Sequence, residues 1–426
     1  MRIGLLGCGI VGGALVELLG ERRAAIAAAT GVDLELARVA VRSISKNRND
    51  SVDTSLLTTD TEGLVDDPTI DVVVEVIGGI EPARTLIKHA LKSGKPVVTA
   101  NKELLANVGA ELYATADAAG VDLLFEAAAA GAIPIVRPLR ESLLGEDVTA
   151  ITGILNGTTN YILTRMSEDG ADYAEALGEA QRLGYAERDP TADVEGFDAG
   201  AKAAIIASLA FGANVVAGDV YHEGISEITQ ADIAFARRLG YEIKLLGIAE
   251  AFGDGDEREI GVRVHPAMVP VSHPLAAVRD SFNAVFVEGS SAGELMFYGR
   301  GAGGRPTASA VLGDLIDAAT NKARGIHQPV PTGRRARIRP IDDLWSAYYV
   351  NIDVVDSPGV LAAVAGVFGQ HGVSIRSMEQ EDLGAEARIA FVTHGARERN
   401  LRATLNDLRQ LDVVAGIRSV LRVVGE

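Results

Sequence analysis

Five acidic side chains gather within a dozen residues near the middle of this sequence: Glu187, Asp189, Asp193, Glu195 and Asp198. Lys202 follows Asp198 by four residues, a spacing that places both side chains on one face of a helix. Because Ala203 to Leu209 is almost wholly apolar, we expect Lys202 at the mouth of a buried segment, where its ammonium group could donate a proton. The carboxylates suit a substrate that carries an ammonium group. The alternative is an exposed ion pair at a helix start, which is common and contributes little.

A second lysine stands in Thr99-Ala100-Asn101-Lys102, directly after an expected strand, Val97 to Thr99. Doubly wound sheets bind their ligands at the carboxyl ends of the strands. A cation at this place could meet a substrate carboxylate or polarise a carbonyl oxygen. The alternative is a surface lysine at the start of a helix.

A GxGxxG pattern, Gly7-Cys8-Gly9-Ile10-Val11-Gly12, lies between an expected strand and an expected helix. Its chemistry is that of the backbone: Gly7 permits a tight turn, Gly9 admits a pyrophosphate, and Gly12 lets the helix pack on the strand. The helix then presents free N–H groups to the anion. We therefore expect a dinucleotide site here. The alternative is a glycine-rich turn that binds nothing.

The second expected strand, Leu34 to Val41, ends in Arg42, with Lys46 close behind. A carboxylate at this position would bind the ribose hydroxyl of NAD and repel a 2′-phosphate, whereas Arg42 can pair with that phosphate. The sequence therefore predicts a preference for NADP, with NAD also possible. The alternative is that Arg42 and Lys46 are ordinary surface cations.

The elements that must position these residues alternate between strand and helix over residues 1–130. Continuous apolar strands are expected at 3–6, 34–41, 72–77, 97–99 and 121–125, and helices at 11–19, 82–93 and 103–119. Such alternation is typical of a Rossmann fold, a doubly wound parallel sheet covered on both faces. Residues 300–325 are expected to complete this domain.

The remaining sequence divides into an α/β domain at 131–325 for substrate binding and dimerisation, a proline- and arginine-rich linker at 326–344, and a small unit at 345–426. In the last unit, strands are expected at 347–355, 374–378, 387–393 and 417–424, and helices at 359–371 and 400–411. The resulting βαββαβ order is the ferredoxin-like plan.

Composition excludes some functions. The net charge of -18 argues against binding to nucleic acid. The apolar stretch from Ala203 to Gly218 is shorter than the ~20 residues of a membrane span, so we expect a buried helix there and no membrane association. The single cysteine, Cys8, fits a reducing compartment, and we expect a cytoplasmic protein.

Several blocks of this sequence resemble the homoserine dehydrogenase family, in matching order over roughly residues 1–325. They are Ala180-x3-Gly184, Asp189-Pro190-x2-Asp193-Val194-x-Gly196-x-Asp198-x3-Lys202, Thr99-Ala100-Asn101-Lys102, Phe125-Glu126-Ala127, Gly131-Ala132-Ile133-Pro134, Leu155-Asn156-Gly157-Thr158-Thr159-Asn160 and Tyr298-Gly299-Arg300-Gly301-Ala302-Gly303. The resemblance implies NADP-dependent interconversion of L-homoserine and L-aspartate 4-semialdehyde, in threonine, methionine and isoleucine biosynthesis.

The same resemblance implies roles for single residues. Lys202 would donate the proton, Lys102 would be a second essential lysine near nicotinamide and substrate, and Glu187 and Asp198 would bind homoserine with support from Asp193. Thr99, Gly184 and Gly303 would touch the cofactor. A sodium or potassium ion could be held by backbone carbonyls at Glu126, Ala129, Gly131 and Ile133, although Ala128-Ala129-Ala130 departs from the family's usual sequence there.

The C-terminal unit resembles an ACT domain through Asp356-Ser357-Pro358-Gly359-Val360-Leu361 and Phe368-Gly369-Gln370-His371-Gly372-Val373-Ser374-Ile375. In this family an ACT domain implies L-threonine as an effector, and both resemblances imply a homodimer or homotetramer. The alternative is a domain that serves structure or dimerisation alone.

Two other functions compete with this interpretation. Aspartate-semialdehyde dehydrogenase acts on the same aldehyde but needs a cysteine nucleophile, and Cys8 lies in the phosphate loop with no histidine nearby in sequence. A catalytically silent amino-acid sensor would not need Lys102, Asp198 and Lys202 together.

Overall fold

The computed structural model describes residues 1–45, 52–253, 255–331, 333–382 and 386–425. Its contacts divide the chain into two compact units. The first unit comprises Met1–Ile151, Gly200–Val220 and Phe282–Ala336. The second unit comprises Thr152–Ala199, Tyr221–Ser281 and Arg337–Glu426.

The first unit is built on a six-stranded parallel sheet with strand order β3-β2-β1-β4-β5-β6. Its strands are β1 (Arg2–Leu6), β2 (Glu35–Ala40), β3 (Leu57–Thr58), β4 (Val72–Glu75), β5 (Val97–Thr99) and β6 (Leu123–Leu124). This is the strand order of dinucleotide-binding folds, in which the ligand crevice opens where the order reverses. Here the reversal falls between β1 and β4, which confirms the predicted doubly wound sheet.

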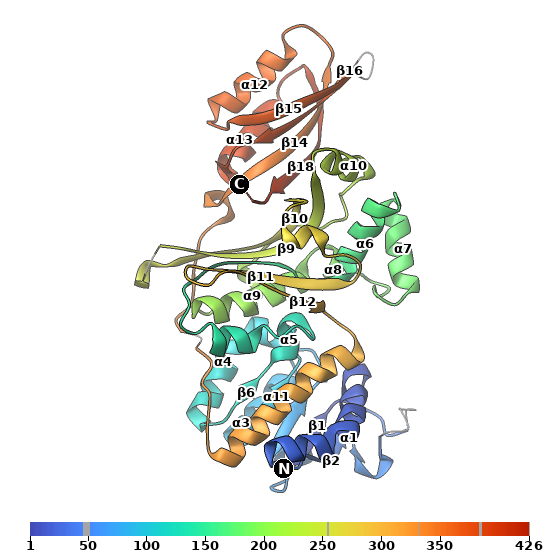
Figure 1. Ribbon diagram of the computed structural model, residues 1–426, viewed down its shortest axis with the longest axis vertical. Coiled ribbons are helices and arrows are strands. Elements are labelled where there is room, and N and C mark those ends of the chain that lie inside the picture. The colour runs from blue at the N-terminus through green and yellow to red at the C-terminus, as the bar shows by residue number, and fades with distance from the viewer. Residues whose placement is uncertain (46–51, 254, 332, 383–385, 426) are drawn as a thin grey trace. The chain divides into compact units, whose positions relative to one another are not determined.

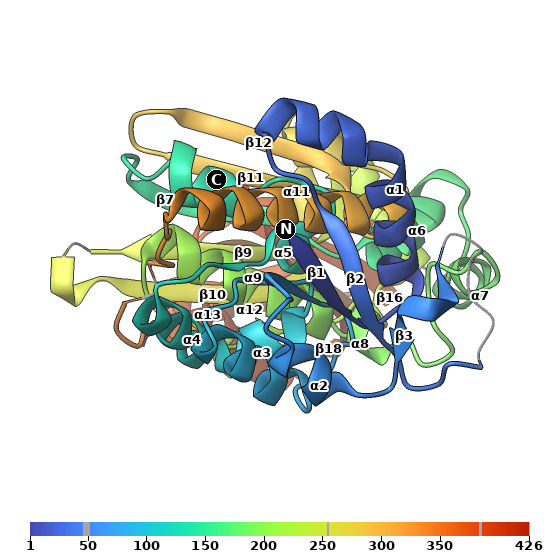
Figure 2. The same cartoon turned by 90° about the horizontal axis from the view of Figure 1, so that it is seen from below.

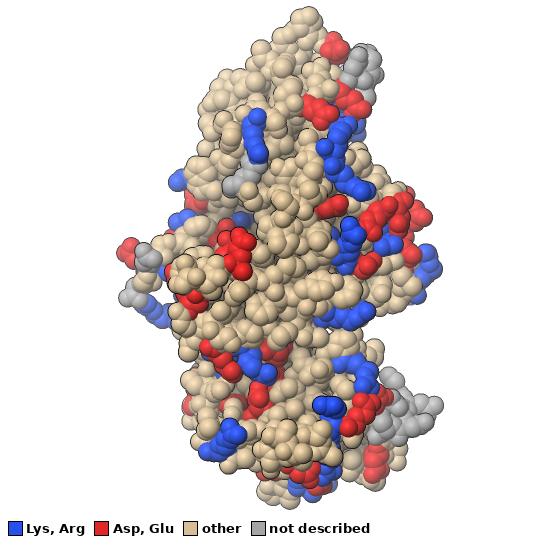
Figure 3. Space-filling model, viewed as in Figure 1, with Lys and Arg blue, Asp and Glu red and all other residues tan. Residues whose placement is uncertain are grey.

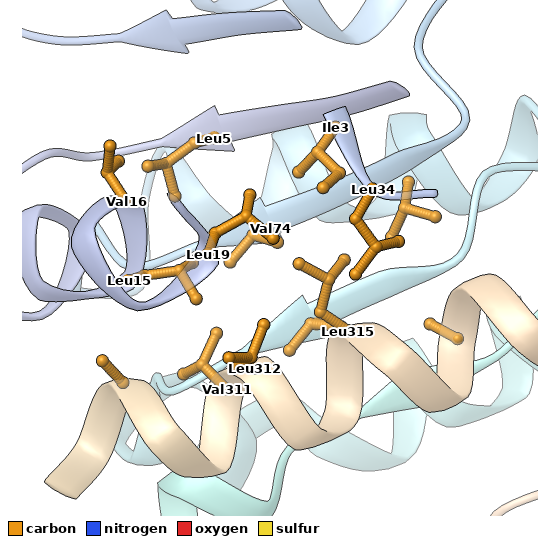
Figure 4. Packing of buried hydrophobic residues seen from close by; sticks show 14 of the residues in the cluster. Ile3, Leu5, Leu15, Val16, Leu19, Leu34, Val74, Val311, Leu312 and Leu315 are labelled. Atoms are coloured by element: carbon orange, nitrogen blue, oxygen red, sulfur yellow. The ribbon is translucent and has the colours of Figure 1, made fainter. Parts of the chain in front are cut away.

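Helices cover both faces of this sheet. They are α1 (Ile10–Thr30), α2 (Thr61–Asp66), α3 (Ala83–Lys92), α4 (Lys102–Ala119), α5 (Glu126–Ala130) and α11 (Gly304–Arg324). Figure 2 shows α1 and α11 on one side of the sheet and α2, α3 and α4 on the other. In Figure 4, Leu15 and Leu19 of α1 meet Val311 and Leu315 of α11 over the strands. The late helix α11 thus completes the core of the first 130 residues.

The first unit also holds an antiparallel pair, β11 (Phe282–Gly289) and β12 (Gly293–Arg300). The strand β7 (Val148–Ile154) lies next to β11. Helix α9 (Phe197–Phe211) passes from the second unit into the first. No helix among the described residues is long and apolar enough to cross a membrane.

The second unit contains a mixed sheet in the order β9-β10-β18-β14-β16-β15. The elements of this unit are α6 (Gly157–Glu168), α7 (Tyr173–Arg182), α8 (Thr191–Val194), β8 (Tyr221–His222), α10 (Gln230–Arg238), β9 (Tyr241–Phe252), β10 (Glu259–Pro270), β13 (Arg337–Ile338), β14 (Trp345–Val355), α12 (Val360–Gln370), β15 (Ile375–Asp382), β16 (Glu386–Thr393), β17 (Ala396–Arg397), α13 (Glu398–Leu408) and β18 (Val414–Val423). Except for the short strands β8, β13 and β17, these elements are labelled in Figure 1.

The C-terminal part of this unit has the predicted βαββαβ order, with the two-residue strand β17 added before α13. Residues at alternate positions of β14, including Val350 and Ile352, pack with Phe368 of α12 and Leu401 of α13 in one apolar core. Alternation along β14 therefore turns one face of the sheet toward both helices.

One edge of β10 is covered by three short segments from different parts of the chain. Strands β13, β8 and β18 pair with it in turn, all parallel, at Glu259–Ile260, at Arg263–Val264 and at Ala267–Met268. The other edge pairs with β9 over its whole length. Since β18 also pairs with β14, the C-terminal domain shares one continuous sheet with β9 and β10. Of the residues expected to form a linker, Arg337 and Ile338 thus belong to this sheet.

Among the described residues on the face shown in Figure 3, acidic and basic side chains are interspersed, and no broad basic patch forms there.

Candidate active site

The turn between β1 and α1 requires its glycines. Gly7 has a φ of 102°, and a Cβ there would lie 2.8 Å from the Val76 carbonyl oxygen. A Cβ at Gly12 would lie 2.3 Å from the Gly7 carbonyl oxygen, whereas no heavy atom lies within 4 Å of a Cβ at Gly9. The turn is thus closed on the inside at Gly7 and Gly12 and open at Gly9, which is the arrangement a pyrophosphate needs.

A second glycine segment lies against this turn. Gly303 has a φ of 118° and precedes α11, and a Cβ at Gly304 would lie 2.8 Å from the Ile10 Cγ2 atom. The Ile10 side chain is 83% exposed, although it opens a helix whose inner face is buried. The starts of α1 and α11 therefore meet, and they bring the predicted cofactor residues Gly7, Gly9, Ile10, Val11, Gly12 and Gly303 into one region. The geometry fits a dinucleotide.

A buried carboxylate organises the ends of β4 and β5. The Glu75 side chain is fully buried and accepts hydrogen bonds from Thr99 Oγ1 at 2.5 Å, Ile77 N at 2.8 Å and Gly78 N at 3.1 Å. Thr99 Oγ1 also accepts from Asn101 N at 3.1 Å. Asn101 in turn caps α4, the helix that Lys102 begins, by accepting from Leu104 N. Glu75 thus links the loop after β4 to the backbone that carries Lys102.

Three further residues were singled out from the sequence: Arg42, Lys46 and Cys8. Arg42 is exposed and lies two residues after the end of β2. Lys46 lies outside the described residues. Cys8 is partly buried and packs against the apolar core of the first unit, in keeping with a small loop residue.

The acidic segment is organised by an asparagine. Asn156 Nδ2 donates to Asp193 Oδ1 at 2.7 Å and to Asp198 Oδ2 at 3.0 Å. Asp193 lies in α8, and Asp198 lies in the first turn of α9. Two of the predicted carboxylates therefore converge on one amide nitrogen.

Lys202 follows one turn later on α9, as the spacing predicts. Its residue is 8% exposed, and the residues from Ala203 to Ala207 after it are all buried. Because Ala199 and Gly200 before it are also buried, the lysine lies within the buried part of the helix.

The segment before α8 is more open. Gly184, Glu187 and Asp189 are all exposed, and the Glu187 carbonyl oxygen accepts from Gln181 Nε2 at 3.1 Å. Asp189 accepts from Thr191 Oγ1 at 2.7 Å, and this hydrogen bond holds the pKa of Asp189 below its usual value. The structure therefore brings Asp193 and Asp198 together, and it leaves Glu187 on an exposed loop.

The proposed cation loop is held by its own carboxylate. Glu126 is 4% exposed, and its side chain accepts from the backbone N–H groups of Ile135, Val136 and Arg137 at 2.6 to 2.8 Å. A Cβ at Gly131 would lie 2.1 Å from the Gly301 carbonyl oxygen, so two of the glycine-rich blocks also meet here. Among the described residues, no group of three or more His, Cys, Asp or Glu side chains could hold a metal ion.

Glu126 is further tied to α11. Its backbone N–H donates to Asp314 Oδ2 at 2.7 Å, and Arg137 pairs with Asp314 and Asp317. Burial, with the nearby Glu126 carboxylate, raises the pKa of Asp314 to about 7. Ala129 and Ile133 are buried on either side of Gly131.

Sequence reasoning missed the roles of Asn156, Glu75 and Asp314. Asn156 stood in a quoted block, and an Asn-Gly pair after a strand signals a helix cap, but its partners lie 37 and 42 residues away. Glu75 had a visible signal, since it is the only charged residue in an apolar strand. Asp314 had none.

Family models match most of the chain. A model described as "Homoserine dehydrogenase" matches residues 134–316, one described as "Homoserine dehydrogenase, NAD binding domain" matches residues 7–126, and one described as "ACT domain" matches residues 348–413.

Relatives and solved structures agree over the full length. Homoserine dehydrogenases of Corynebacterium glutamicum and Bacillus subtilis are 51% and 42% identical to this chain, over 99% and 100% of its length and 95% and 98% of theirs. The crystal structure of a homoserine dehydrogenase from Thiobacillus denitrificans has a TM-score of 0.93 at 41% identity, over 99% of this chain and 98% of that one. The chain is therefore an oxidoreductase, and it belongs to the homoserine dehydrogenase family.

Proposed function

We propose that this enzyme interconverts L-homoserine and L-aspartate 4-semialdehyde with NADP as its preferred cofactor. The observation that carries the substrate assignment is the pair of carboxylates, Asp193 and Asp198, held together one helical turn before the buried Lys202. Carboxylates bind the ammonium group that both substrates carry. This reaction serves threonine, methionine and isoleucine biosynthesis, and the single cysteine is in keeping with a cytoplasmic enzyme.

In the direction of aldehyde reduction, Lys202 donates a proton to the oxygen of the aldehyde as negative charge develops there. Glu187 and Asp198 hold the substrate ammonium, and Asp193 supports Asp198. Lys102 binds near the reacting carbon, where its charge can orient the substrate. The bound dinucleotide supplies the hydride, and the chain's residues supply orientation and the proton. In the oxidative direction Lys202 accepts the hydroxyl proton.

The cofactor assignment rests on the turn Gly7–Gly12, with Thr99, Gly184 and Gly303 as further contacts and Arg42 and Lys46 as partners of the 2′-phosphate. The structure of a hyperthermophilic archaeal homoserine dehydrogenase was solved in complex with NADPH. It is 29% identical to this chain, covers 77% of it and 99% of its own length, and has a TM-score of 0.64. Arg42→Ala should lower the preference for NADP, measured as kcat/KM with NADP divided by kcat/KM with NAD, about tenfold. This is the effect expected when one ion pair with a phosphate group is lost. A wild-type preference of about tenfold or more for NAD would refute the assignment.

Further features belong to the same proposal. The domains are 1–130 with 300–325 for the cofactor, 131–325 for substrate and dimerisation, 326–344 as a linker, and 345–426 for regulation. Backbone carbonyls of Glu126, Ala129, Gly131 and Ile133 bind a sodium or potassium ion. The enzyme is a homodimer or homotetramer, and side chains of β12 such as Met296 and Tyr298, 36% and 55% exposed, suit a subunit contact.

The regulatory proposal is that L-threonine binds the ACT domain and inhibits turnover. The turn at Gly359 supports this proposal. Gly359 has a φ of 93° and is the N-cap residue of α12, and no side chain forms a capping hydrogen bond there.

The deciding experiment follows NADP⁺ reduction with L-homoserine, with and without L-threonine. We expect turnover that threonine suppresses. Turnover without suppression would remove the regulatory proposal, and no turnover in folded protein that binds NADP would refute the catalytic one.

A further inference from the structure

Asn156 joins two parts of the second unit that the sequence keeps apart. It follows β7 and serves as the N-cap of α6, where its Oδ1 atom accepts from Thr159 N at 2.9 Å. Its Nδ2 atom points the other way and donates to Asp193 and Asp198. Asn156 is 4% exposed and its two carboxylate partners are partly exposed, so the hydrogen bonds between them are partly shielded from water.

The orientation of this amide is determined by its partners. The backbone N–H of Thr159 needs an acceptor, and the two carboxylates need a donor, so a reversed amide would lose all of these hydrogen bonds. Thr159 Oγ1 also lies 3.1 Å from Oδ1, and as a hydroxyl group it can pair with the amide in either orientation. Both hydrogens of the amide group therefore point toward carboxylates.

Two carboxylates that approach one another repel, and each would turn toward water if nothing held it. A neutral amide with two N–H groups can bind both carboxylates without neutralising their charge. A lysine or arginine at position 156 would instead act as their counter-ion. The amide therefore brings the two carboxylates together without supplying a positive charge of its own.

We propose that Asn156 is a positioning residue for the substrate ammonium group: it sets the spacing of Asp193 and Asp198. This inference rests on the proposed function, which assigns these two carboxylates to the substrate. Asn156 contacts the carboxylates rather than the reacting atoms, so its loss should affect the binding of homoserine more than the binding of the cofactor.

The test uses Asn156→Asp and Asn156→Ser in the full-length protein. Asp and Ser are both good N-cap residues, so either variant keeps the cap of α6 while the amide donors are lost. We expect KM for L-homoserine to rise about tenfold or more, as for a lost hydrogen bond to a charged group, with KM for NADP⁺ changed less than about twofold.

The pH profile separates the two variants. In Asn156→Asp a third carboxylate joins the pair, and like charges raise carboxyl pKa values, so the acidic limb of kcat/KM should move to higher pH. In Asn156→Ser no charge is added, and the limb should move less than in Asn156→Asp. A role in capping alone predicts wild-type KM values and wild-type pH profiles for both.

Asp172→Ala is the matched control. Asp172 caps the neighbouring helix α7 by accepting from Glu175 N at 2.8 Å, and it is exposed. Its loss should lower the melting temperature without changing KM for L-homoserine. If wild-type protein oxidises homoserine and both Asn156 variants keep its KM, the inference is wrong. If wild-type protein does not oxidise homoserine, the proposed function has failed instead.

Discussion

The turn at Gly7–Gly12 and the carboxylate group around Asn156 are built in opposite ways. The turn consists of backbone, and its shape depends on glycines that have no side chain. At Gly12, for example, the absence of a Cβ leaves room for the Gly7 carbonyl oxygen. The carboxylate group consists of two side chains, from α8 and α9, that meet on the amide nitrogen of Asn156. A site made of backbone can be recognised from a short motif, whereas a site made of side chains needs the whole fold.

Removing a side chain should therefore do most harm where side chains make the site. Lys202→Ala should lower kcat at least ~10²-fold, the usual contribution of a general acid, while leaving the melting temperature nearly unchanged. Steady-state kinetics with L-homoserine and saturating NADP⁺ would measure this. Near-normal turnover in a folded variant would remove Lys202 from the mechanism.

Adding a side chain should do most harm where backbone makes the site. Gly12→Ala places a Cβ 2.3 Å from a backbone oxygen, and we expect a loss of about 3 kcal/mol in the free energy of unfolding, together with weaker NADP⁺ binding. Gly13→Ala is the control, because no heavy atom lies within 4 Å of its Cβ and alanine favours a helix. Denaturant unfolding would compare them, and equal stabilities would contradict the distinction.

Only arrangements of side chains should respond strongly to pH. The raised pKa of Asp314, about 7, means that the folded protein holds a proton that the unfolded chain releases near pH 4. Stability from this group is thus complete below about pH 4 and falls as pH rises to about 7, by roughly 2 kcal/mol between pH 5 and pH 7. Asp314→Asn should flatten this slope in urea unfolding. An unchanged slope would show that other groups cause it.

The extent to which the sequence predicted the structure follows the same division. The strands around the glycine turn were predicted because they are continuous apolar runs, as for β5 after Pro96, and a helix such as α4 is bounded by a glycine, Gly120. Strand β3 and helix α2 were missed, since two residues and six residues are too short to show a period.

The site was predicted as residue types and not as contacts. Lys202 and Asp198 were found because helical spacing relates them. The pairing of Glu126 with Asp314 spans 188 residues, and no local pattern can indicate it. The Asn156-Gly157 pair is a local signal for a helix cap that was not used, and the second role of the Asn156 amide depends on where α8 and α9 fold back.

The covered edge of β10 has a consequence for how the chain is made. Strand β18 pairs with β10 at Ala267 and Met268, yet it is synthesised only after the helices and the other strands of the C-terminal domain. Until then this end of β10 is an open strand edge, of the kind that invites pairing with another chain. This end of β10 can be covered only once β18 has been synthesised, so a ribosome stalled between β14 and β18 would carry a nascent chain with an uncovered strand edge.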